Sequence, residues 1–351
     1  MSRFFSEKYN SLMPYTPGEQ PGTRDYVKLN TNECPFPPSP LAVELAAKAA
    51  ENLNLYSDPE LKKIRAELAD YYGVGKENVI CGNGSDEILD FAFAAFCDKN
   101  TPAVFPDITY GFYPVFSEAN FIPYKEVPLR EDFTVDTDGL IENKGTVFIA
   151  NPNAPTGIFL PLSEIERILK AKKDNVVVVD EAYIDFGGES AVKLTEKYDN
   201  LLVTGTFSKS RSLAGGRLGF GIGNDQLIND LNTLRYSRNP YNVNSMTEAA
   251  GIGAVRDDAY MKKNVKTIAE NREYLIGELR KLGFSVPDSA ANFVFATKSG
   301  FSGSFLYEEL KKRRVLVRHF SKPRIDDYLR ITVGTREQVD ILLGELKTII
   351  S

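Results

Sequence analysis

The sequence contains a single histidine, His319, among its 351 residues. A metal site built from several histidines is therefore excluded, and a Ser-His-Asp or Cys-His catalytic arrangement could use only this one residue. His319 follows the apolar run R-V-L-V-R, and we interpret it as a partly exposed loop residue rather than a catalytic group. If the protein is an enzyme, we expect another side chain to carry protons.

Cysteines and long apolar segments are also scarce. Cys34, Cys81 and Cys97 show no C-x-x-C spacing, so the sequence predicts neither a disulfide framework nor a cysteine zinc site, and it fits a reducing cytoplasm. The longest apolar run, F-A-F-A-A-F-C at 91–97, is far shorter than the roughly 20 residues of a membrane span. The start, M-S-R-F-F-S-E-K-Y-N, has no apolar signal region. We expect a cytoplasmic protein with no bound metal and no membrane contact.

Basic residues do not cluster along the chain, and the net charge is −6. This distribution excludes the electrostatic footprint of a protein that binds nucleic acid or an anionic membrane. Hydrophobic residues make up 42% of the sequence, which is enough for sizeable cores in a chain of about two domains. Any anion that the protein binds must be small and held locally.

Alternating apolar runs and helical patterns predict an α/β fold. The expected strands are N-V-I-C, P-A-V-F, T-V-F-I-A, V-V-V-V-D and L-L-V-T-G-T-F. Continuous apolar strands separated by helices indicate a mostly parallel central sheet that helices cover on both faces. We assign this large domain to 31–245, a smaller α+β domain to 246–351, and an N-terminal arm that packs with the small domain to 1–30.

The residues just after each strand are candidates for a binding site, because ligands of such sheets bind beyond the carboxyl ends of the strands. In C-G-N-G-S-D-E, glycines between a strand and a helix allow a ligand close to the backbone, and the helix N-terminus offers N–H groups to an anion. Ser85 suits contact with a phosphate oxygen. The alternative is an ordinary helix cap. The segment is not a Walker loop, since no G-K-[ST] follows.

A carboxylate, Asp180, ends the apolar run V-V-V-V-D. An isolated carboxylate at the mouth of a buried strand costs several kcal/mol, so we expect a cation to face it. Tyr183, three residues later, is placed to donate a hydrogen bond into the same site. The alternative is that Asp180 caps the following turn.

Lys209 follows another apolar strand in T-F-S-K-S-R-S-L-A-G-G-R-L-G-F. A low-dielectric environment favours its neutral amine, which is a nucleophile toward carbonyls, whereas the alternative is a lysine that extends to the solvent at the rim. Arg217 presents a fork suited to phosphate, Ser208 adds a hydroxyl, and nearby glycines admit close contact. A carboxylate for a ring nitrogen, a lysine for an aldehyde and several phosphate ligands together meet the demands of pyridoxal phosphate.

The chain resembles the fold-type-I aminotransferases, and among them the histidinol-phosphate aminotransferases, over nearly its whole length. The motifs that carry the resemblance are K-L-N-T-N-E-C-P-F-P-P-S-P (28–40), N-L-Y-S-D-P (54–59), C-G-N-G-S-D-E (81–87), T-Y-G-F-Y (109–113), N-P-N-A-P-T-G (151–157), D-E-A-Y-I-D-F (180–186), T-F-S-K-S-R-S-L-A-G-G-R-L-G (206–219), A-N-F-V-F (291–295) and L-R-I-T-V-G-T (329–335).

The resemblance implies pyridoxal 5′-phosphate as cofactor and a role for each matching residue. Lys209 would bond to the cofactor aldehyde and then move a proton between the substrate Cα and C4′, Asp180 would pair with the ring nitrogen, and Tyr183 would contact the ring oxygen O3′. Tyr110 would stack on the ring. The phosphate would be held by Ser85, Asp86, Ser208 and Arg217. Relatives usually have asparagine where this chain has Ala154, so Asn153 or Asn151 is expected to replace it at O3′.

The resemblance also implies the substrates: L-histidinol phosphate and 2-oxoglutarate, converted to imidazole acetol phosphate and glutamate in histidine biosynthesis. Arg330 and Arg318 would hold the substrate phosphate with Tyr15 and Tyr56. Tyr56 would reach in from a neighbouring subunit, which implies a homodimer. For the two arginines, the alternative is that they form surface salt bridges.

Three other functions remain open at this stage. Related enzymes act on phenylalanine or tyrosine, threonine-phosphate decarboxylase shares much of the scaffold, and aminotransferase-like domains also serve as ligand sensors without catalysis. Turnover of a panel of amines with 2-oxoglutarate would separate them.

Overall fold

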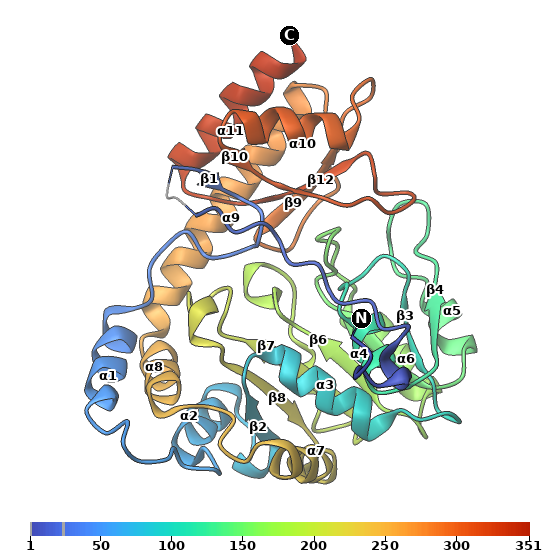
Figure 1. Ribbon diagram of the computed structural model, residues 1–351, viewed down its shortest axis with the longest axis vertical. Coiled ribbons are helices and arrows are strands. Elements are labelled where there is room, and N and C mark those ends of the chain that lie inside the picture. The colour runs from blue at the N-terminus through green and yellow to red at the C-terminus, as the bar shows by residue number, and fades with distance from the viewer. Residues whose placement is uncertain (1, 23–24) are drawn as a thin grey trace.

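The computed structural model describes residues 2–22 and 25–351 and places two domains one above the other (Figure 1). The lower domain is built on a seven-stranded sheet with the order β2-β8-β7-β6-β5-β3-β4. Strand β8 is antiparallel to β2 and β7, and the remaining pairs are parallel. The α/β fold predicted from the sequence is confirmed. The strands are β2 (Val79–Gly82), β3 (Ala103–Pro106), β4 (Tyr124–Val127), β5 (Thr146–Ala150), β6 (Val177–Asp180), β7 (Leu201–Thr206) and β8 (Gly219–Gly223).

Successive residues of the central strands enter different hydrophobic cores, which explains their unbroken apolar sequence. Val177 and Val179 of β6 pack in one core, and Val178 between them packs in the other. Side chains of α2 (Lys62–Tyr72), α6 (Leu162–Ala171) and α8 (Ser245–Arg256) complete the first core. The second core is completed by α3 (Ser85–Phe96), α4 (Tyr113–Ala119) and α7 (Asp225–Arg238).

The upper domain contains a small antiparallel sheet with the order β11-β12-β9, and a strand near the N-terminus, β1, that pairs in parallel with β10. Helix α9 rises from the lower domain into the upper one (Figure 1). The elements are β1 (Val27–Lys28), β9 (Phe293–Thr297), β10 (Val315–Leu316), β11 (Arg318–His319), β12 (Tyr328–Thr332), α9 (Asp258–Lys281), α10 (Gly303–Lys312) and α11 (Arg336–Ile350). The remaining helical segments are α1 (Pro40–Ala50), α5 (Thr137–Glu142), η1 (Glu7–Tyr9), η2 (Lys76–Asn78), η3 (Ile184–Phe186), η4 (Ala191–Leu194) and η5 (Ala214–Gly216).

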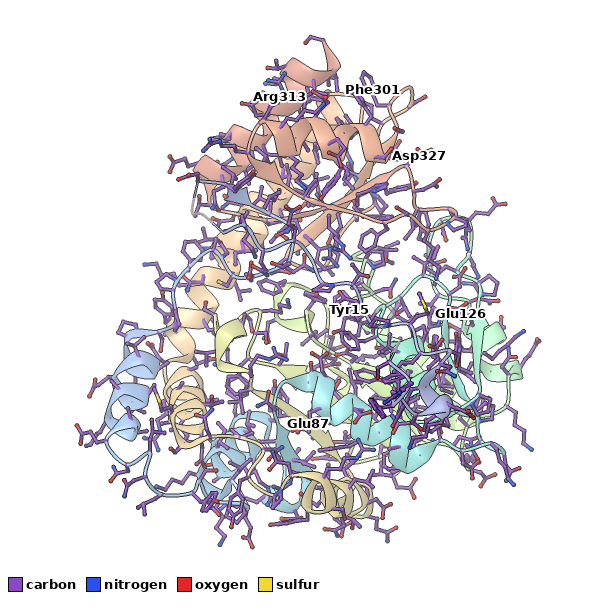
Figure 2. All side chains as sticks on the ribbon, in the orientation of Figure 1. Tyr15, Glu87, Glu126, Phe301, Arg313 and Asp327 are labelled. Atoms are coloured by element: carbon purple, nitrogen blue, oxygen red, sulfur yellow. The ribbon has the colours of Figure 1, made fainter. Side chains whose placement is uncertain are left out.

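The N-terminal arm contacts both domains. Its first part lies on the lower domain, where the rings of Tyr9 and Phe121 are 5.3 Å apart. Farther along, Glu19 forms an ion pair of 2.9 Å with Lys311 of the upper domain. Between these points, Tyr15 lies in the space where the two domains meet (Figure 2). The arm therefore spans the junction, rather than packing on the small domain alone.

The glycine-rich strand β8 was not predicted, and its glycines have a packing reason. A Cβ on Gly219 would lie 2.1 Å from the backbone nitrogen of Ser85, so only glycine lets the start of α3 sit directly on this strand. At Gly215 an added Cβ would meet no atom within 4 Å, so the protein itself does not require glycine at that position. Close packing at Gly219 sets the position of the α3 N-terminus.

Candidate active site

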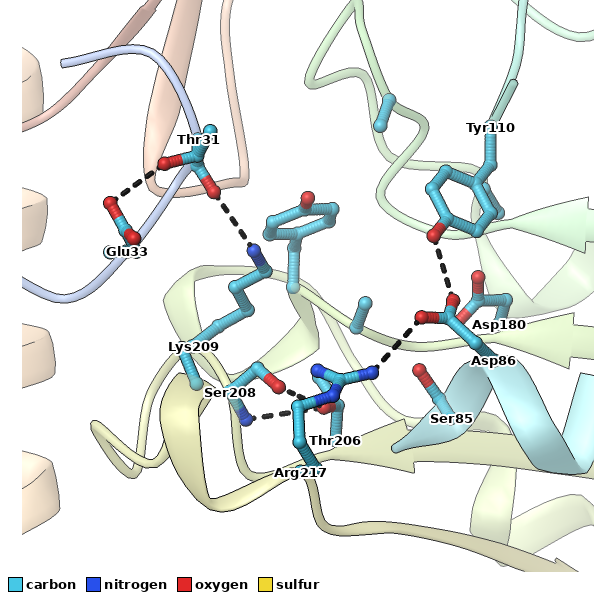
Figure 3. A pocket seen from close by; sticks show the side chains of 15 residues that line it. Thr31, Glu33, Ser85, Asp86, Tyr110, Asp180, Thr206, Ser208, Lys209 and Arg217 are labelled. Atoms are coloured by element: carbon cyan, nitrogen blue, oxygen red, sulfur yellow. Dashed lines mark hydrogen bonds and ion pairs between the residues drawn. The ribbon is translucent and has the colours of Figure 1, made fainter. Parts of the chain in front are cut away.

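A cavity at the carboxyl ends of β6 and β7 collects most of the predicted cofactor residues (Figure 3). It is lined by Ser85, Asp86, Tyr110, Asp180, Tyr183, Ser208, Lys209 and Arg217 together with Thr31, Glu33, Ala150, Ala154, Ala182, Thr206 and Ala214. Residues from six separate parts of the chain thus meet where parallel strands end, as expected for this sheet type.

Lys209 reaches across this cavity toward the N-terminal segment (Figure 3). Its Nζ donates a hydrogen bond of 3.1 Å to the backbone oxygen of Thr31 and lies 5.8 Å from the ring centre of Tyr183. Burial, followed by the positive charge of Arg330, lowers the pKa of Lys209 to about 8. The amine is therefore available in its neutral, nucleophilic form far more readily than an exposed lysine.

Asp180 is the last residue of β6, and only 5% of it is exposed. Tyr113 and Thr204 donate hydrogen bonds to its two carboxylate oxygens, at 3.3 and 3.2 Å. Burial, followed by the negative charge of Asp86, raises the pKa of Asp180 to about 7. Among residues 2–22 and 25–351, no lysine or arginine forms an ion pair with Asp180. These residues therefore do not supply the cation that would offset the burial of this carboxylate.

Asp86 links two predicted cofactor residues at the opposite side of the cavity. Its carboxylate accepts a hydrogen bond of 2.7 Å from the hydroxyl of Tyr110 and lies 3.2 Å from Nη2 of Arg217. A carboxylate repels a phosphate, so the side chain of Asp86 does not suit phosphate binding and instead orients Arg217. The group of Asp86 that suits a phosphate is its backbone N–H. Asp86 and Ser85 open helix α3, where N–H groups lack intrahelical partners.

Ser208 adds a hydroxyl beside this helix end. Its Oγ accepts a hydrogen bond of 3.0 Å from Thr206, and its backbone nitrogen donates to the same Thr206 hydroxyl. Arg217 itself has a left-handed backbone, with φ at 54°. Together, the guanidinium, the hydroxyls and the helix N-terminus can hold a phosphate group.

Several residues that shape the site were not singled out from the sequence. Asn32 donates a hydrogen bond of 2.9 Å to the hydroxyl of Tyr183, and its own backbone oxygen accepts one from Asn292. Tyr113 and Thr204 hold Asp180. The motif K-L-N-T-N-E contains Asn32, Thr31 and Glu33, but nothing in its local pattern indicates that it folds against residues 150 positions later.

Asn151 and Asn153 do not line the cavity, contrary to the expectation that one of them replaces the missing asparagine. The amide nitrogen of Asn153 donates to the oxygens of Ile108 and Thr156, both at 3.0 Å. Asn151 exchanges hydrogen bonds of 3.0 and 2.8 Å with the backbone of Leu160. Both side chains are buried. Asn151 braces its own loop, and Asn153 ties that loop to the segment after β3, while Ala154 is the residue of the loop that faces the cavity.

A second cavity continues from the first and contains the predicted substrate residues Tyr15, Arg318 and Arg330. Arg318 of β11 and Arg330 of β12 are register partners in the small sheet. Nη2 of Arg330 donates to the backbone oxygen of Asn30 at 3.2 Å, and the two guanidinium nitrogens of Arg318 donate to the arm. Tyr15 stacks on Phe112 with ring centres 4.3 Å apart. This cavity combines the guanidinium groups of Arg318 and Arg330 with aromatic walls, and its lining also includes Lys209, Lys322 and Asp107.

Tyr56 lies outside both cavities. It is 84% exposed and stacks on Tyr241 at a ring distance of 4.5 Å. Tyr56 was expected to act in the cavity of a neighbouring subunit, and in its own chain it is a surface residue that lines neither cavity. His319 also lies outside both cavities; it belongs to β11 rather than to a loop, and its Nε2 is 2.7 Å from the backbone oxygen of Asp326.

No cluster of potential metal ligands occurs among residues 2–22 and 25–351, and no helix in this part of the chain is long and apolar enough to cross a membrane. All three cysteines are free.

Comparisons with known proteins agree with this arrangement. Residues 24–346 match the family described as "Aminotransferase class I and II". The chain is 47% identical to a histidinol-phosphate aminotransferase of Brachyspira hyodysenteriae, covering 100% of this chain and 99% of that protein, and 46% identical to one of Clostridium beijerinckii, covering 100% and 98%. Its fold superposes with a TM-score of 0.90 on the Sinorhizobium meliloti histidinol-phosphate aminotransferase in complex with pyridoxal 5′-phosphate, at 24% identity over 100% of this chain and 98% of that one.

Proposed function

Because the chain belongs to the class I and II aminotransferase family, we propose that it transfers an amino group from L-histidinol phosphate to 2-oxoglutarate with pyridoxal 5′-phosphate as cofactor. The products would be imidazole acetol phosphate and glutamate, in histidine biosynthesis. Full-length relatives at 43 to 47% identity that bear the name histidinol-phosphate aminotransferase support this reaction. The three free cysteines fit the reducing cytoplasm, where we expect the enzyme to act.

The observation that carries the proposal is the shared cavity of Lys209, Asp180 and Arg217. When bound, the cofactor supplies an aldehyde for an amine and a cationic ring that accepts the electron pair released when the substrate Cα loses its proton. The buried carboxylate of Asp180, which has no cationic partner in the described chain, fits the ring nitrogen. Arg217, Ser208 and the start of α3 fit the phosphate, with Tyr110 and Tyr183 beside the ring.

Lys209 is the group placed to move the proton. Its Nζ reaches across the cavity, and with a pKa of about 8 roughly a tenth of the amine is neutral at pH 7 and able to accept a proton from the substrate Cα. An exposed lysine has a pKa near 10.4 and would be almost wholly protonated under the same conditions. The same nitrogen can return the proton to a neighbouring carbon, which completes the proton transfer that must precede hydrolytic release of the keto product.

The charge of the second cavity favours a substrate with an anionic tail. Arg330 and Arg318 lie side by side there, and hydrogen bonds to charged groups contribute about 1.5 to 3 kcal/mol each. The binding energy that two arginines contribute to a phosphate dianion is therefore larger than most differences in binding energy among the neutral side chains of alternative substrates. The carboxylate of 2-oxoglutarate would use the same positive charge in the second half of the reaction.

A homodimer would complete the site. Tyr56, at 84% exposed, has Leu53 and Leu55 beside it at 54% and 65% exposed. Exposed apolar residues gathered in this way mark an interaction surface. A second copy covering this surface would bring Tyr56 toward the neighbouring substrate cavity and would bury these side chains.

An aromatic amino acid aminotransferase is the second candidate. The rings of Tyr15, Tyr110 and Phe320 line the substrate cavity and would accept phenylalanine or tyrosine, with the arginines on the carboxylate. Release of glutamate from 2-oxoglutarate, measured with L-histidinol phosphate, phenylalanine, tyrosine and phosphothreonine as separate donors, tests the proposal. We expect the highest kcat/KM with L-histidinol phosphate, and a higher value with either aromatic amino acid would contradict it.

A further inference from the structure

We propose that Asn32 is a positioning residue that sets the direction of the Tyr183 hydroxyl, so that its proton points into the cofactor cavity at the carboxyl ends of β6 and β7. Asn32 belongs to the segment after β1 and is separated from Tyr183 by 151 positions in the chain. That Tyr183 stands beside the cofactor ring rests on the proposed function. The hydrogen bonds that fix its hydroxyl do not, because the protein's own residues form them.

The first link is the hydrogen bond between the two side chains. Nδ2 of Asn32 donates to the hydroxyl oxygen of Tyr183 at 2.9 Å. A phenol whose oxygen accepts in this way keeps its single proton for another partner. Tyr183 donates to no other group among residues 2–22 and 25–351, although its side chain lines the cavity. The proton is therefore available to an acceptor inside the cavity.

The second link fixes which way the Asn32 amide faces. The backbone N–H of Asn32 donates to Oγ1 of Thr332 at 3.0 Å, and that hydroxyl donates back to Oδ1 of Asn32 at 3.0 Å. Both residues are buried, at 2% and 4% exposed. If the amide were turned over, the Thr332 proton would face an NH2 group and have no acceptor, which is destabilising in a buried position. Thr332 of β12 therefore holds the NH2 group of Asn32 toward Tyr183.

The backbone of Asn32 is held as well as its side chain. Asn292 donates a hydrogen bond of 2.9 Å to the backbone oxygen of Asn32. The φ angle of Asn32 is 57°, in the left-handed region that glycine, asparagine and aspartate tolerate best. The ring of Tyr183 packs edge-on against Phe293, with ring centres 5.0 Å apart. Residues of the small domain thus fix both partners of the hydrogen bond.

The Tyr183 hydroxyl keeps its proton at neutral pH. Burial raises its pKa above the usual 10.0, while Arg330 of β12 and the accepted hydrogen bond act against this rise. Asp180 of β6 and Asp86 of α3 raise it further, and Nζ of Lys209 lies 5.8 Å from the ring centre. A neutral phenol whose oxygen already accepts a hydrogen bond is a strengthened donor. It suits an acceptor that carries negative charge, such as the ring oxygen of the cofactor.

The pH dependence of the visible absorbance of bound pyridoxal 5′-phosphate tests the direction of this hydroxyl. A donor to the ring oxygen stabilises the form of the cofactor that has lost a proton, so it lowers the midpoint of the absorbance change. Asn32→Asp keeps the shape of the side chain and suits the left-handed backbone, but a carboxylate accepts from Tyr183 and cannot donate to it. We expect Asn32→Asp and Tyr183→Phe each to raise the midpoint by about one to two pH units, since both remove a charge-assisted hydrogen bond.

Two further variants separate this effect from added charge and from a structural role. The double variant Asn32→Asp/Tyr183→Phe should have the midpoint of Tyr183→Phe alone, to within about 0.3 pH units. Additive shifts would overturn the proposal, because the new charge would then act independently of the hydroxyl. Asn32→Gly suits the backbone and removes the donor without supplying an acceptor, so it should give less than about a third of the Asn32→Asp shift. An equal or larger shift in Asn32→Gly would show a merely structural role.

An unchanged midpoint in Asn32→Asp would also overturn the proposal. If that variant does not fold, Thr332→Val carries the test, because Oδ1 of Asn32 then lacks its donor and the amide is free to turn. The midpoint should rise in Thr332→Val but not in Thr332→Ser, which keeps the hydroxyl, and equal midpoints in these two variants would contradict the proposal. Turnover of L-histidinol phosphate by the wild type separates the two ideas, because absent turnover with the expected midpoints contradicts only the proposed function.

Discussion

Nζ of Lys209 donates a hydrogen bond of 3.1 Å to the backbone oxygen of Thr31. Thr31 comes three residues after β1, which pairs with β10 of the small domain. Its hydroxyl donates to Glu33 at 2.7 Å, and Glu33 forms an ion pair with Lys28. The free amine of the large domain is therefore held by a segment that the small domain keeps in place.

The pH dependence of Lys209 follows from this buried position. In the protein stripped of cofactor, modification of Lys209 by an amine-specific reagent should rise with a midpoint near pH 8, because burial and Arg330 lower its pKa to about 8. Peptide mass spectrometry measures the rate for each lysine. Exposed lysines serve as the control and should titrate near 10.4. Arg330→Met should move the Lys209 midpoint upward, and a wild-type midpoint at the value of exposed lysines would contradict the electrostatic account.

The ionised form of Asp180 should destabilise the protein without cofactor at neutral pH. Its folded pKa of about 7 lies above the usual 3.8, so the folded state binds the extra proton between these values and loses stability as pH rises through that window. Without cofactor, the free energy of unfolding of Asp180→Asn should therefore exceed that of the wild type by about 2 to 4 kcal/mol at pH 8. Most of this difference should disappear at pH 4. Urea unfolding at both pH values measures the difference. An advantage of equal size at both would count against ionisation as its cause.

Gly219 should be intolerant of a side chain, whereas Gly215 should accept one. A Cβ on Gly219 would lie 2.1 Å from the backbone nitrogen of Ser85, so Gly219→Ala must displace the start of α3, and we expect a loss of about 1 to 3 kcal/mol in the free energy of unfolding. Gly215→Ala is the matched control, with no atom within 4 Å of the new methyl group, and should change stability by less than about 0.5 kcal/mol. Equal effects of the two changes in urea unfolding would disagree with the packing described.

Arg330→Ala should raise KM for both L-histidinol phosphate and 2-oxoglutarate by about tenfold or more. The reason is the loss of charge-assisted hydrogen bonds, each of which contributes about 1.5 to 3 kcal/mol. Arg313→Ala is the control, because Arg313 pairs with Glu345 and lines neither cavity. Steady-state kinetics with each substrate varied in turn measures the change. An unchanged KM for L-histidinol phosphate would refute the assignment of Arg330.

Much of the large domain could be predicted because its signals are local. Apolar runs identified β5, β6 and β7. Asp180 at the end of β6 and Lys209 just after β7 do line one cavity. Strand β8 could not be predicted in this way, since three of the five residues in its sequence G-F-G-I-G are glycine, which is depleted in strands, and only Phe220 and Ile222 favour one. The glycines of β8 instead allow helix α3 to pack closely on the strand.

The parts of the site that depend on long-range contacts were not visible in the sequence. Asn32 donates to Tyr183 across 151 residues of the chain, and Arg318 reaches Thr16 across 302. The two asparagines expected at the cavity, Asn151 and Asn153, turn away from it and donate to the backbone carbonyls of Leu160 and Ile108, which need donors because they are buried. Residue type alone does not indicate which side chain of this loop faces the cavity, where Ala154 lies.

The most direct test traps the cofactor on the protein. The wild type is incubated with pyridoxal 5′-phosphate, reduced with borohydride, digested and analysed by peptide mass spectrometry, with Lys209→Ala treated in parallel. The account predicts the added mass of the reduced cofactor on Lys209 alone, and none in the variant. Attachment to a different lysine, or an equal yield in Lys209→Ala, would contradict it.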